Sequence, residues 1–206
     1  MIAIVDYEAG NLRSVQRACD AIGVESVVTG DPAAIARAGR VIFPGVGAAP
    51  SAMAALRAKG LDDALRQAFA NGVPILGICL GTQIVLSRSE EGPVDCLGLI
   101  GGSTRRFRLR NPALKIPHMG WNGVFLRKPH PLLTGVEDGD EFYFVHSYYP
   151  DPADPADVCA VAEYEAPFCC ALGRANLFAT QFHPEKSGRF GLRLLERFAR
   201  WDGSPC

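Results

Sequence analysis

The stretch that decides the fold is Val73-Pro-Ile-Leu-Gly-Ile-Cys-Leu-Gly-Thr-Gln83. Its first half is apolar and predicts a buried strand over residues 73–78, and the glycines on either side of Cys79 predict a sharp turn into a helix. Such a turn holds its central residue in a strained conformation, and side chains at the flanking positions would collide with it or with its neighbours. The pattern Gly77-x-Cys79-x-Gly81 therefore predicts a nucleophile elbow, with cysteine in the place that serine takes in hydrolases.

The chain before this stretch alternates between short β-branched runs and segments with apolar residues at helical spacing. We expect strands over 2–6, 24–28 and 40–43, and helices over 11–22, from Asp31-Pro32 onward, and over 51–69 with a break near Gly60. Strands that alternate with helices are joined by right-handed crossovers, which produce a largely parallel sheet with helices on both faces. This half of the chain therefore predicts an α/β fold.

After the stretch the pattern changes to short strands separated by turn residues, which we expect to be antiparallel or mixed. The predicted strands span 97–100, 123–126, 141–145, 158–162, 168–172 and 177–181, and they are accompanied by a surface loop over 150–157 and one helix over 188–201. At 206 residues the chain is long enough for one sizeable core and short for two, so we expect a single domain over 1–206.

The composition excludes several classes of protein. Apolar residues make up 48% and charged residues 21%, as in ordinary soluble proteins, and a net charge of −1 without a basic stripe gives no support for a nucleic-acid partner. The N-terminus lacks the basic start of a signal peptide, and the longest stretch without charge, 67–87, is interrupted by polar residues and Pro74, so we expect no membrane span. Seven cysteines without regular spacing or a CxxC pair indicate reduced thiols, a cytoplasmic protein and no metal site.

Cys79 is the candidate nucleophile, because a thiol at a helix N-terminus meets unpaired amides and a dipole that favour the thiolate. The alternative is a buried cysteine that serves as a small hydrophobic residue. A thiolate nucleophile needs a base that is oriented by a third group. His183 and Glu185 follow a predicted strand and, two residues apart, face the same side of an extended chain, although such a pair can also be an ordinary surface contact.

Pro44-Gly-Val-Gly47 follows the predicted strand 40–43 at the carboxyl edge of the sheet, where ligands collect in open α/β folds. The backbone N–H groups of Val46 and Gly47, with that of Leu80 after the nucleophile, are candidates for an oxyanion hole. The alternative is a tight turn without a catalytic role.

The other three histidines are weaker candidates than His183 for the general base. We expect His118 in a loop that contains Pro and Gly, and His130, which stands between two prolines, at the surface. His146 ends an aromatic strand and is expected to be partly buried and hydrogen-bonded. The adjacent Cys169 and Cys170 point to opposite faces of a strand, which favours packing in the core over ligation of a metal.

In order and spacing, Pro-Gly-Val-Gly47, Gly-Ile-Cys-Leu-Gly-Thr-Gln83 and His-Pro-Glu185 resemble the motifs of the class I, triad-type glutamine amidotransferases. The resemblance implies the flavodoxin-like three-layer fold of that family, with attack of the Cys79 thiolate on the carboxamide of L-glutamine, His183 as base and then acid, and Glu185 as the orienter of His183. It also implies that no cofactor is needed and that glutamine is held at Gly47, Gln83, Ser147 and Tyr148.

Longer blocks, among them Lys115-Ile-Pro-His-Met-Gly-Trp-Asn122 and Phe142-Tyr-Phe-Val-His-Ser-Tyr148, are similar to one branch of the family, the glutaminase subunits of imidazole glycerol phosphate synthase, and the similarity covers 2–198. It implies a heterodimer with a (β/α)₈-barrel cyclase subunit, which uses the ammonia to make imidazole glycerol phosphate and AICAR in L-histidine biosynthesis. It also implies that three residues face this partner, Asn11, Trp121 and Lys186. Glu8 stands where the family usually has glycine, so we expect a different turn there.

Three alternatives account for part of these motifs. A glutaminase subunit that serves anthranilate, aminodeoxychorismate or pyridoxal phosphate synthesis would share the triad but lack the two longer blocks. A non-catalytic docking subunit would not need an intact triad, and a cysteine peptidase of similar fold would not accept glutamine.

Overall fold

The structure is a computed structural model in which residues 1–8 and 10–204 are described. Its helices are α1 (Leu12–Ala21), α2 (Pro32–Ala36), α3 (Ala49–Ala58), α4 (Leu61–Ala70), α5 (Leu80–Ile84) and α6 (Gly188–Arg200), with short 3₁₀ helices η1 (Pro131–Leu133), η2 (Pro155–Asp157) and η3 (Pro184–Lys186). The strands are β1 (Ile2–Val5), β2 (Ser26–Thr29), β3 (Arg40–Gly45), β4 (Ile75–Cys79), β5 (Arg88–Ser89), β6 (Val94–Asp95), β7 (Gly102–Arg106), β8 (His118–Leu126), β9 (Asp140–His146), β10 (Tyr148–Pro152), β11 (Val158–Tyr164), β12 (Ala166–Arg174) and β13 (Leu177–Thr180).

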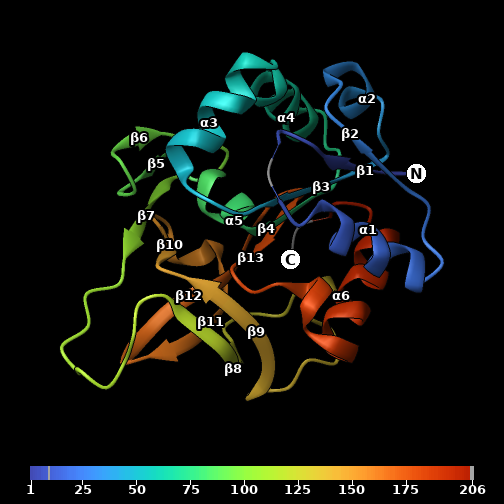
Figure 1. Cartoon of the computed structure of the whole chain (residues 1–206). Helices are drawn as coiled ribbons and strands as arrows, with labels where there is room; N and C mark the ends of the chain where they lie inside the picture. The colour runs from blue at the N-terminus through green and yellow to red at the C-terminus, as the bar shows by residue number, and fades with distance from the viewer. Residues whose placement is uncertain (9, 205–206) are drawn as a thin grey trace.

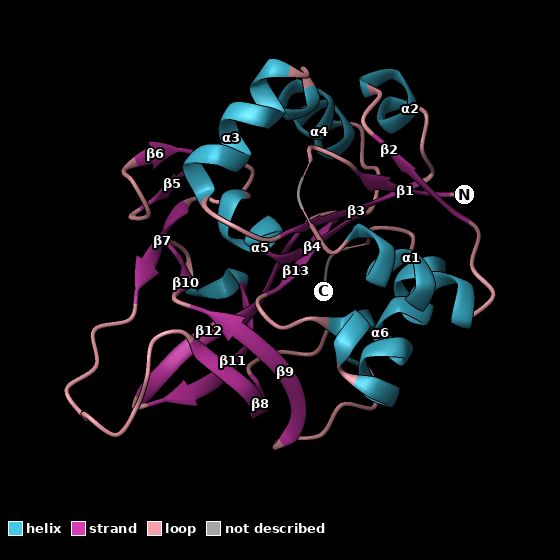
Figure 2. Cartoon of the chain, in the orientation of Figure 1, coloured by secondary structure: helices cyan, strands magenta, loops and turns pink. Residues whose placement is uncertain are grey.

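A large sheet runs through the molecule in the strand order β2-β1-β3-β4-β13-β12-β11-β8-β9. The first five strands in this order pair in parallel, and the pairs from β13–β12 to β8–β9 are antiparallel. The helices α2, α3 and α4 cover one face of the parallel half, and α1 and α6 cover the other (Figures 1 and 2). The predicted α/β fold, with a parallel first half and antiparallel strands in the second, is therefore confirmed.

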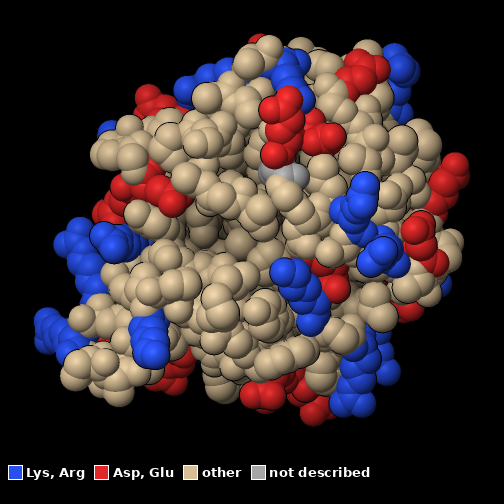
Figure 3. All heavy atoms as spheres, viewed as in Figure 1, with Lys and Arg blue, Asp and Glu red and all other residues tan. Residues whose placement is uncertain are grey.

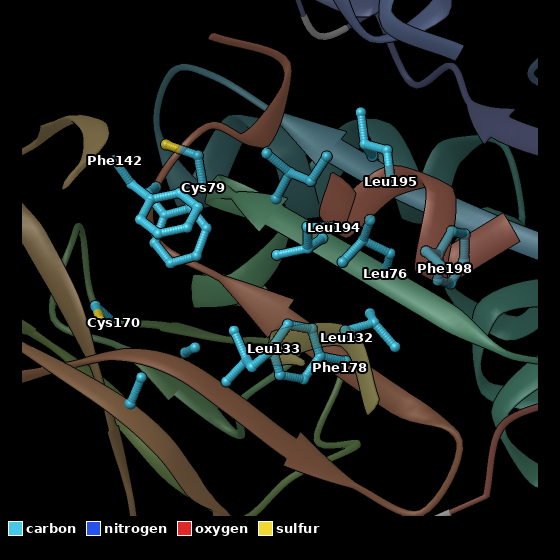
Figure 4. Packing of buried hydrophobic residues seen from close by; sticks show 14 of the residues in the cluster. Leu76, Cys79, Leu132, Leu133, Phe142, Cys170, Phe178, Leu194, Leu195 and Phe198 are labelled. Carbon is cyan, nitrogen blue, oxygen red and sulfur yellow. The ribbon is translucent and has the colours of Figure 1, made fainter. Parts of the chain in front are cut away.

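Each face of the sheet has its own apolar core. Successive residues of β4 point to opposite faces, so Leu76 packs in the cluster that contains α1 and α6, and Ile75 packs in the cluster under α3 and α4. Figure 4 shows the first cluster, where Leu194 and Phe198 of α6 lie close to Leu76. Because β4 is buried on both faces, its residues are apolar without alternation, which explains the continuous apolar run in the sequence.

The helices and strands predicted for the first half of the chain agree closely with those in the structure. The predicted helix over 51–69 is two helices, α3 and α4, which meet at Gly60, where a φ of 66° is a conformation that glycine adopts without strain. Asp31 accepts a hydrogen bond from the Ala33 N–H at 2.9 Å, which confirms it as the cap of α2.

The predicted strand over 97–100 is wrong. The N–H groups of these residues bond instead to carbonyls at the end of α5 and just after it, among them Leu97 to Ile84 at 2.9 Å and Leu99 to Val85 at 2.9 Å. Leu97 and Ile100 are buried against that helix end, which explains their apolar character without a sheet.

The predicted loop over 150–157 is also wrong in part, since its first residues belong to β10. This strand forms the edge of a second, four-stranded sheet in the order β10-β7-β5-β6. Pro150 and Pro152 fit there because an edge strand pairs on one side only and tolerates residues that lack an N–H. The strands β5, β6 and β7 were not predicted. Within the described residues no helix is long and apolar enough to cross a membrane.

Candidate active site

Cys79 occupies the turn that the sequence predicts. It is the last residue of β4 and stands just before α5, and its φ of 54° and ψ of −105° lie where a residue with a Cβ is strained. The flanking glycines are required by close packing: a Cβ on Gly77 would lie 2.8 Å from the Cβ of Ala179, and a Cβ on Gly81 would lie 1.9 Å from the Phe43 carbonyl oxygen. The surroundings therefore hold the thiol at a fixed point between strand and helix.

His183 and Glu185 form a buried pair. The Nδ1 atom of His183 lies 2.7 Å from Oε1 of Glu185, and the two side chains are 1% and 0% exposed. Residues 184–186 form the 3₁₀ helix η3 and not the continuation of an extended strand, yet the two side chains still meet. The surface-contact alternative for this pair is therefore excluded.

The charge state of His183 depends on its two neighbours. Burial lowers the pKa of its imidazole, but interactions with Cys79 and Glu185 outweigh burial and raise that pKa to about 10. The Nε2 atom is buried and has no hydrogen-bond partner among the described residues. A raised pKa favours the imidazolium form of His183, so its Nε2 carries a proton that is available for transfer inside the cavity.

Asn11 also contacts the pair, which the sequence did not predict. Its Nδ2 donates to the same oxygen of Glu185, Oε1, that faces His183. Asn11 stands at the start of α1 in a left-handed conformation with a φ of 75°, and its side chain makes no capping hydrogen bond to the helix. The carboxylate is thus fixed from two sides.

Cys79 and His183 line one cavity of about 310 Å³. Every residue predicted for the oxyanion hole and for glutamine lines it as well, and the full lining is Val46, Gly47, Cys79, Leu80, Gln83, Glu91, Pro117, Val145, His146, Ser147, Tyr148 and His183. Figure 3 shows a hollow near α5 whose surroundings are largely uncharged. A larger cavity of about 590 Å³ lies at β7, β10, β11 and β12 and is lined by none of the three triad residues.

The segment predicted for the oxyanion hole begins where β3 ends. Gly45 pairs with Cys79 in the sheet register, so Val46 and Gly47 continue the chain beside the elbow. A Cβ on Gly45 would lie 1.9 Å from the Tyr7 hydroxyl, and Gly47 has a φ of 99°, which is a conformation suited to glycine. Both glycines of the motif are explained by these two observations.

Gln83 is held by two acceptors deep in the site. Its Nε2 donates to the Tyr148 carbonyl at 3.0 Å and to Oε1 of Gln181 at 3.1 Å. Gln181 is fully buried, and its own Nε2 lies 3.7 Å from the Cys79 sulfur. Gln181 was missed as a site residue, since its only sequence signal was its place at the end of a predicted strand.

Glu91 was missed for a similar reason. It follows β5 in a turn that the sequence did not predict, and its Oε2 accepts a hydrogen bond from the Ala49 N–H at 2.7 Å. It is the one carboxylate that lines the 310 Å³ cavity among the described residues.

The remaining histidines are all buried. The loop placement of His118 is wrong, because it begins β8 and is 4% exposed, and the surface placement of His130 is wrong, because it is 5% exposed and packs on Phe178 and Trp201. Proline neighbours suggested exposure, whereas apolar contacts from distant segments decide it. His146 is hydrogen-bonded as predicted, with Nδ1 2.7 Å from the Tyr148 carbonyl, and at 5% exposed it is more deeply buried than the partial burial predicted. Cys169 and Cys170 lie in the core, which confirms that prediction.

The residues predicted to face a partner gather near Tyr143. Trp121 is 54% exposed, its ring centre is 6.1 Å from that of Tyr143, and the Lys186 ammonium lies 5.8 Å from the centre of the same ring. Asn11 is half-buried and points to Glu185, the neighbour of Lys186.

At the unusual Glu8, the backbone takes the left-handed conformation with a φ of 69°. Its N–H bonds to Asp6 at 2.9 Å and its carboxylate pairs with Lys59 at 3.1 Å. A side chain in this conformation costs about 1 kcal/mol, which these local contacts help to offset.

Comparison with known proteins gives a consistent result. The family model described as "Glutamine amidotransferase class-I" matches residues 3–200. The protein named "Imidazole glycerol phosphate synthase subunit HisH" of Dechloromonas aromatica (strain RCB) is 50% identical, with 97% of this chain and 96% of the relative covered. The protein of the same name from Nitratidesulfovibrio vulgaris (strain Hildenborough) is 51% identical, with 98% and 96% covered.

Among solved structures, "Crystal structure of glutamine amidotransferase" matches with a TM-score of 0.76 at 17% identity, covering 98% of this chain and 100% of the other. "Structure of PurLQS from Thermotoga maritima" matches with a TM-score of 0.75 at 19% identity, covering 97% of each chain. At these identities the two structures support the fold alone.

Proposed function

The chain belongs to the class-I glutamine amidotransferase family and, within it, to the imidazole glycerol phosphate synthase subunits HisH, and from this premise we propose that it hydrolyses L-glutamine to glutamate and ammonia at Cys79. The observation that carries the proposal is that the strained Cys79 lines one cavity with His183, whose Nδ1 is paired with the buried carboxylate of Glu185. A nucleophile, a base and an orienting carboxylate are the groups that acyl transfer through a covalent intermediate requires.

The reaction begins when the Cys79 sulfur attacks the carboxamide carbon and a C–S bond forms, which moves an electron pair onto the carbonyl oxygen. Backbone N–H groups of Val46, Gly47 and Leu80 stabilise that oxyanion, each such donor contributing about 10²- to 10³-fold in rate. The imidazolium of His183 donates its Nε2 proton to the amide nitrogen, the C–N bond breaks, and ammonia leaves. The product is a glutamyl thioester.

Water then attacks the thioester carbon while His183 accepts a proton from it. The C–S bond breaks, glutamate leaves, and the thiolate of Cys79 again faces a protonated His183. Glu185 holds the imidazole in the orientation that both proton transfers need, because it fixes Nδ1 at 2.7 Å.

Glutamine fits the cavity by size and by charge. A cavity of about 310 Å³ is at the small end for ligand sites, as a single amino acid requires. Glu91 supplies a carboxylate for the α-ammonium group, and Gly47, Gln83, Ser147 and Tyr148 enclose the rest of the substrate. No cofactor takes part in this scheme.

The ammonia is used by a second subunit, in keeping with the name of the relatives. We place the (β/α)₈-barrel cyclase subunit against the face formed by Asn11, Trp121 and Lys186, where Trp121 and Met119 expose 54% and 62% of their surface. Large exposed apolar side chains of this kind mark interaction surfaces. The complex makes imidazole glycerol phosphate and AICAR in the cytoplasm, and the chain serves it as one amidotransferase domain over 1–206.

The test combines labelling with mutation. A glutamine-mimicking diazoketone should attach to Cys79, and Cys79→Ala should abolish glutamine-dependent synthesis by the complex while ammonia-dependent synthesis continues. Absence of labelling with intact docking supports the non-catalytic alternative, and peptide cleavage without glutamine hydrolysis supports the peptidase. Synthesis by a different partner enzyme, such as anthranilate synthase, supports the other amidotransferase subunits.

A further inference from the structure

Three buried or half-buried polar side chains on β8 and β9 form a line that leads to the active-site cavity. His118 and His146 pair directly in the strand register, are 4% and 5% exposed, and approach to 3.0 Å between Nδ1 of His118 and Nε2 of His146. Asn122 lies on the same face of β8, with Nδ2 3.2 Å from Nε2 of His118 and 2.9 Å from the Glu163 carbonyl. The three residues connect the middle of β8 with the cavity, which His146 lines.

The positions of the protons follow from the last acceptor in the line. A carbonyl oxygen only accepts, so Nδ1 of His146, at 2.7 Å from the Tyr148 carbonyl, carries a proton. The Nε2 of a neutral His146 is then an acceptor, which requires a proton on Nδ1 of His118. The Nε2 of His118 is in turn an acceptor for the amide group of Asn122, whose second N–H serves Glu163.

This arrangement is satisfied only when both rings are neutral. A second proton on His146 would face the N–H of His118, and a second proton on His118 would face the N–H of Asn122. Burial agrees with this requirement, since it lowers the pKa of His118 to about 4 and that of His146 to about 3. The line therefore has one direction, from Asn122 to Tyr148.

The Tyr148 carbonyl joins this line to the catalytic machinery. It accepts a second hydrogen bond from Nε2 of Gln83 at 3.0 Å. The same Nε2 donates to Gln181, and Gln181 donates to the Cys79 sulfur. A displacement of the Tyr148 carbonyl would thus shift Gln83, and both residues line the cavity.

We propose that Asn122, His118 and His146 are positioning residues that act as a hydrogen-bond relay, which fixes the Tyr148 carbonyl and the Gln83 amide for glutamine binding. The inference rests on the proposed function, because Gln83 and Tyr148 are assigned there to glutamine. A role in packing is the competing account, since His118 stacks on Tyr164 at 4.2 Å between ring centres and contacts Phe107. Packing requires an aromatic ring at position 118, whereas the relay requires an N–H group there that donates to His146.

The test uses two replacements of His118 that separate ring from donor, in complex with the cyclase subunit. His118→Phe keeps the ring and loses the donor, and it should raise the KM for glutamine about tenfold with less than about a threefold change in kcat. His118→Asn keeps a donor near the position of Nδ1 and should raise KM less, although it should unfold at a lower temperature because it leaves a void. The opposite order in KM overturns the inference.

Asn122→Asp is a second variant. The fold should tolerate it, because Asn122 is half-buried at the edge of the line and the two side chains have the same shape. It replaces the donor with an acceptor and should also raise the KM. The matched control is His130→Phe, a buried histidine that packs on Phe178 and Trp201 away from the cavity, and its KM should equal that of the wild type. Equal KM values for Asn122→Asp and wild type overturn the relay.

A spectroscopic measurement adds a readout that does not depend on activity. ¹⁵N–¹H correlation at pH 7 should show both His118 and His146 in the Nδ1–H form, and an Nε2–H form of either ring overturns the inference. Lack of glutamine hydrolysis by the wild-type complex overturns the proposed function and the relay with it. Hydrolysis by the wild type with an unchanged KM in His118→Phe and Asn122→Asp overturns the relay alone.

Discussion

Replacement of Asn11 by glycine should slow glutamine hydrolysis while leaving the backbone at the start of α1 in place. Asn11 has a φ of 75°, a conformation that glycine adopts readily and alanine does not, so Asn11→Gly removes the carboxamide with little strain. The lost group is a donor to Oε1 of Glu185, the oxygen that also faces His183. The substitution therefore acts on the carboxylate that contacts Nδ1 of His183, the proposed base.

The magnitude follows from the kind of bond that is lost. A hydrogen bond to a charged group contributes about 1.5–3 kcal/mol, which is about 10- to 150-fold in rate if it acts in the transition state alone. Water can reach the space that the side chain leaves, since Asn11 is half-buried, so the lower part of this range applies. We expect kcat to fall about tenfold.

The assay is steady-state glutamine hydrolysis by the complex at saturating cyclase subunit, together with the dissociation constant of the two subunits. Asn11→Asp is the companion variant: it sets a second carboxylate against Glu185 and should cost more than glycine does, because like charges repel in a buried site. If kcat is unchanged in Asn11→Gly while the two subunits bind each other more weakly, this would falsify the role of Asn11 in holding Glu185 and leave it a role at the interface alone.

Three further outcomes follow from individual contacts. Gly81→Ala should lower the free energy of unfolding by about 1–3 kcal/mol or more in chemical denaturation, because its Cβ would lie 1.9 Å from the Phe43 carbonyl oxygen, whereas the control Gly39→Ala, with its nearest atom at 3.7 Å, should change little. The free energy of unfolding, measured by chemical denaturation, should fall as the pH is lowered from about 6.5 towards 4. Burial holds the pKa of His118, His130 and His146 at about 4, 4 and 3, so the unfolded chain binds more protons than the folded chain in this range. A free energy of unfolding that does not change with pH over this range contradicts the prediction. In Cys79→Ala the pKa of His183 should drop from about 10, because the sulfur that raises it is gone, and an NMR titration in which it stays near 10 would assign the shift to Glu185 alone.

The parallel half of the fold was predictable because each of its elements has a local signal. Alternation of β-branched runs with helical spacing, the Asp31 cap and the break at Gly60 are all set by neighbouring residues. The second half depends on contacts between distant residues. Leu97 and Ile100 carry the same apolar signal as a strand, but they cover the end of α5, which no local pattern indicates.

In the candidate site, too, residues with a local sequence signal could be predicted and contacts between distant residues could not. Cys79 and the segment 46–47 could be predicted as candidates because glycines accompany them in the sequence, and His183 and Glu185 could be predicted because they are two residues apart. Asn11 reaches Glu185 across 174 residues, and Gln83 reaches Gln181 across 98, so neither contact has a signature in the sequence. Sequence reasoning placed Asn11 at the partner face and left out its contact with Glu185.

The arrangement of strands explains why these distant residues meet. β3, β4 and β13 are parallel neighbours, with Gly45 opposite Cys79 and Thr180 opposite Ile78, so their carboxyl ends bring the segment 46–47, the nucleophile and the chain leading to His183 to one edge of the sheet. The Ser147–Tyr148 link comes from the antiparallel half, where β9 gives way to the second sheet. The parallel half thus supplies Cys79 and leads to His183, and the antiparallel half supplies Ser147 and Tyr148 to the lining of the same cavity. Because no residue of β8 lines this cavity, a substitution in β8 should change the KM for glutamine before it changes kcat.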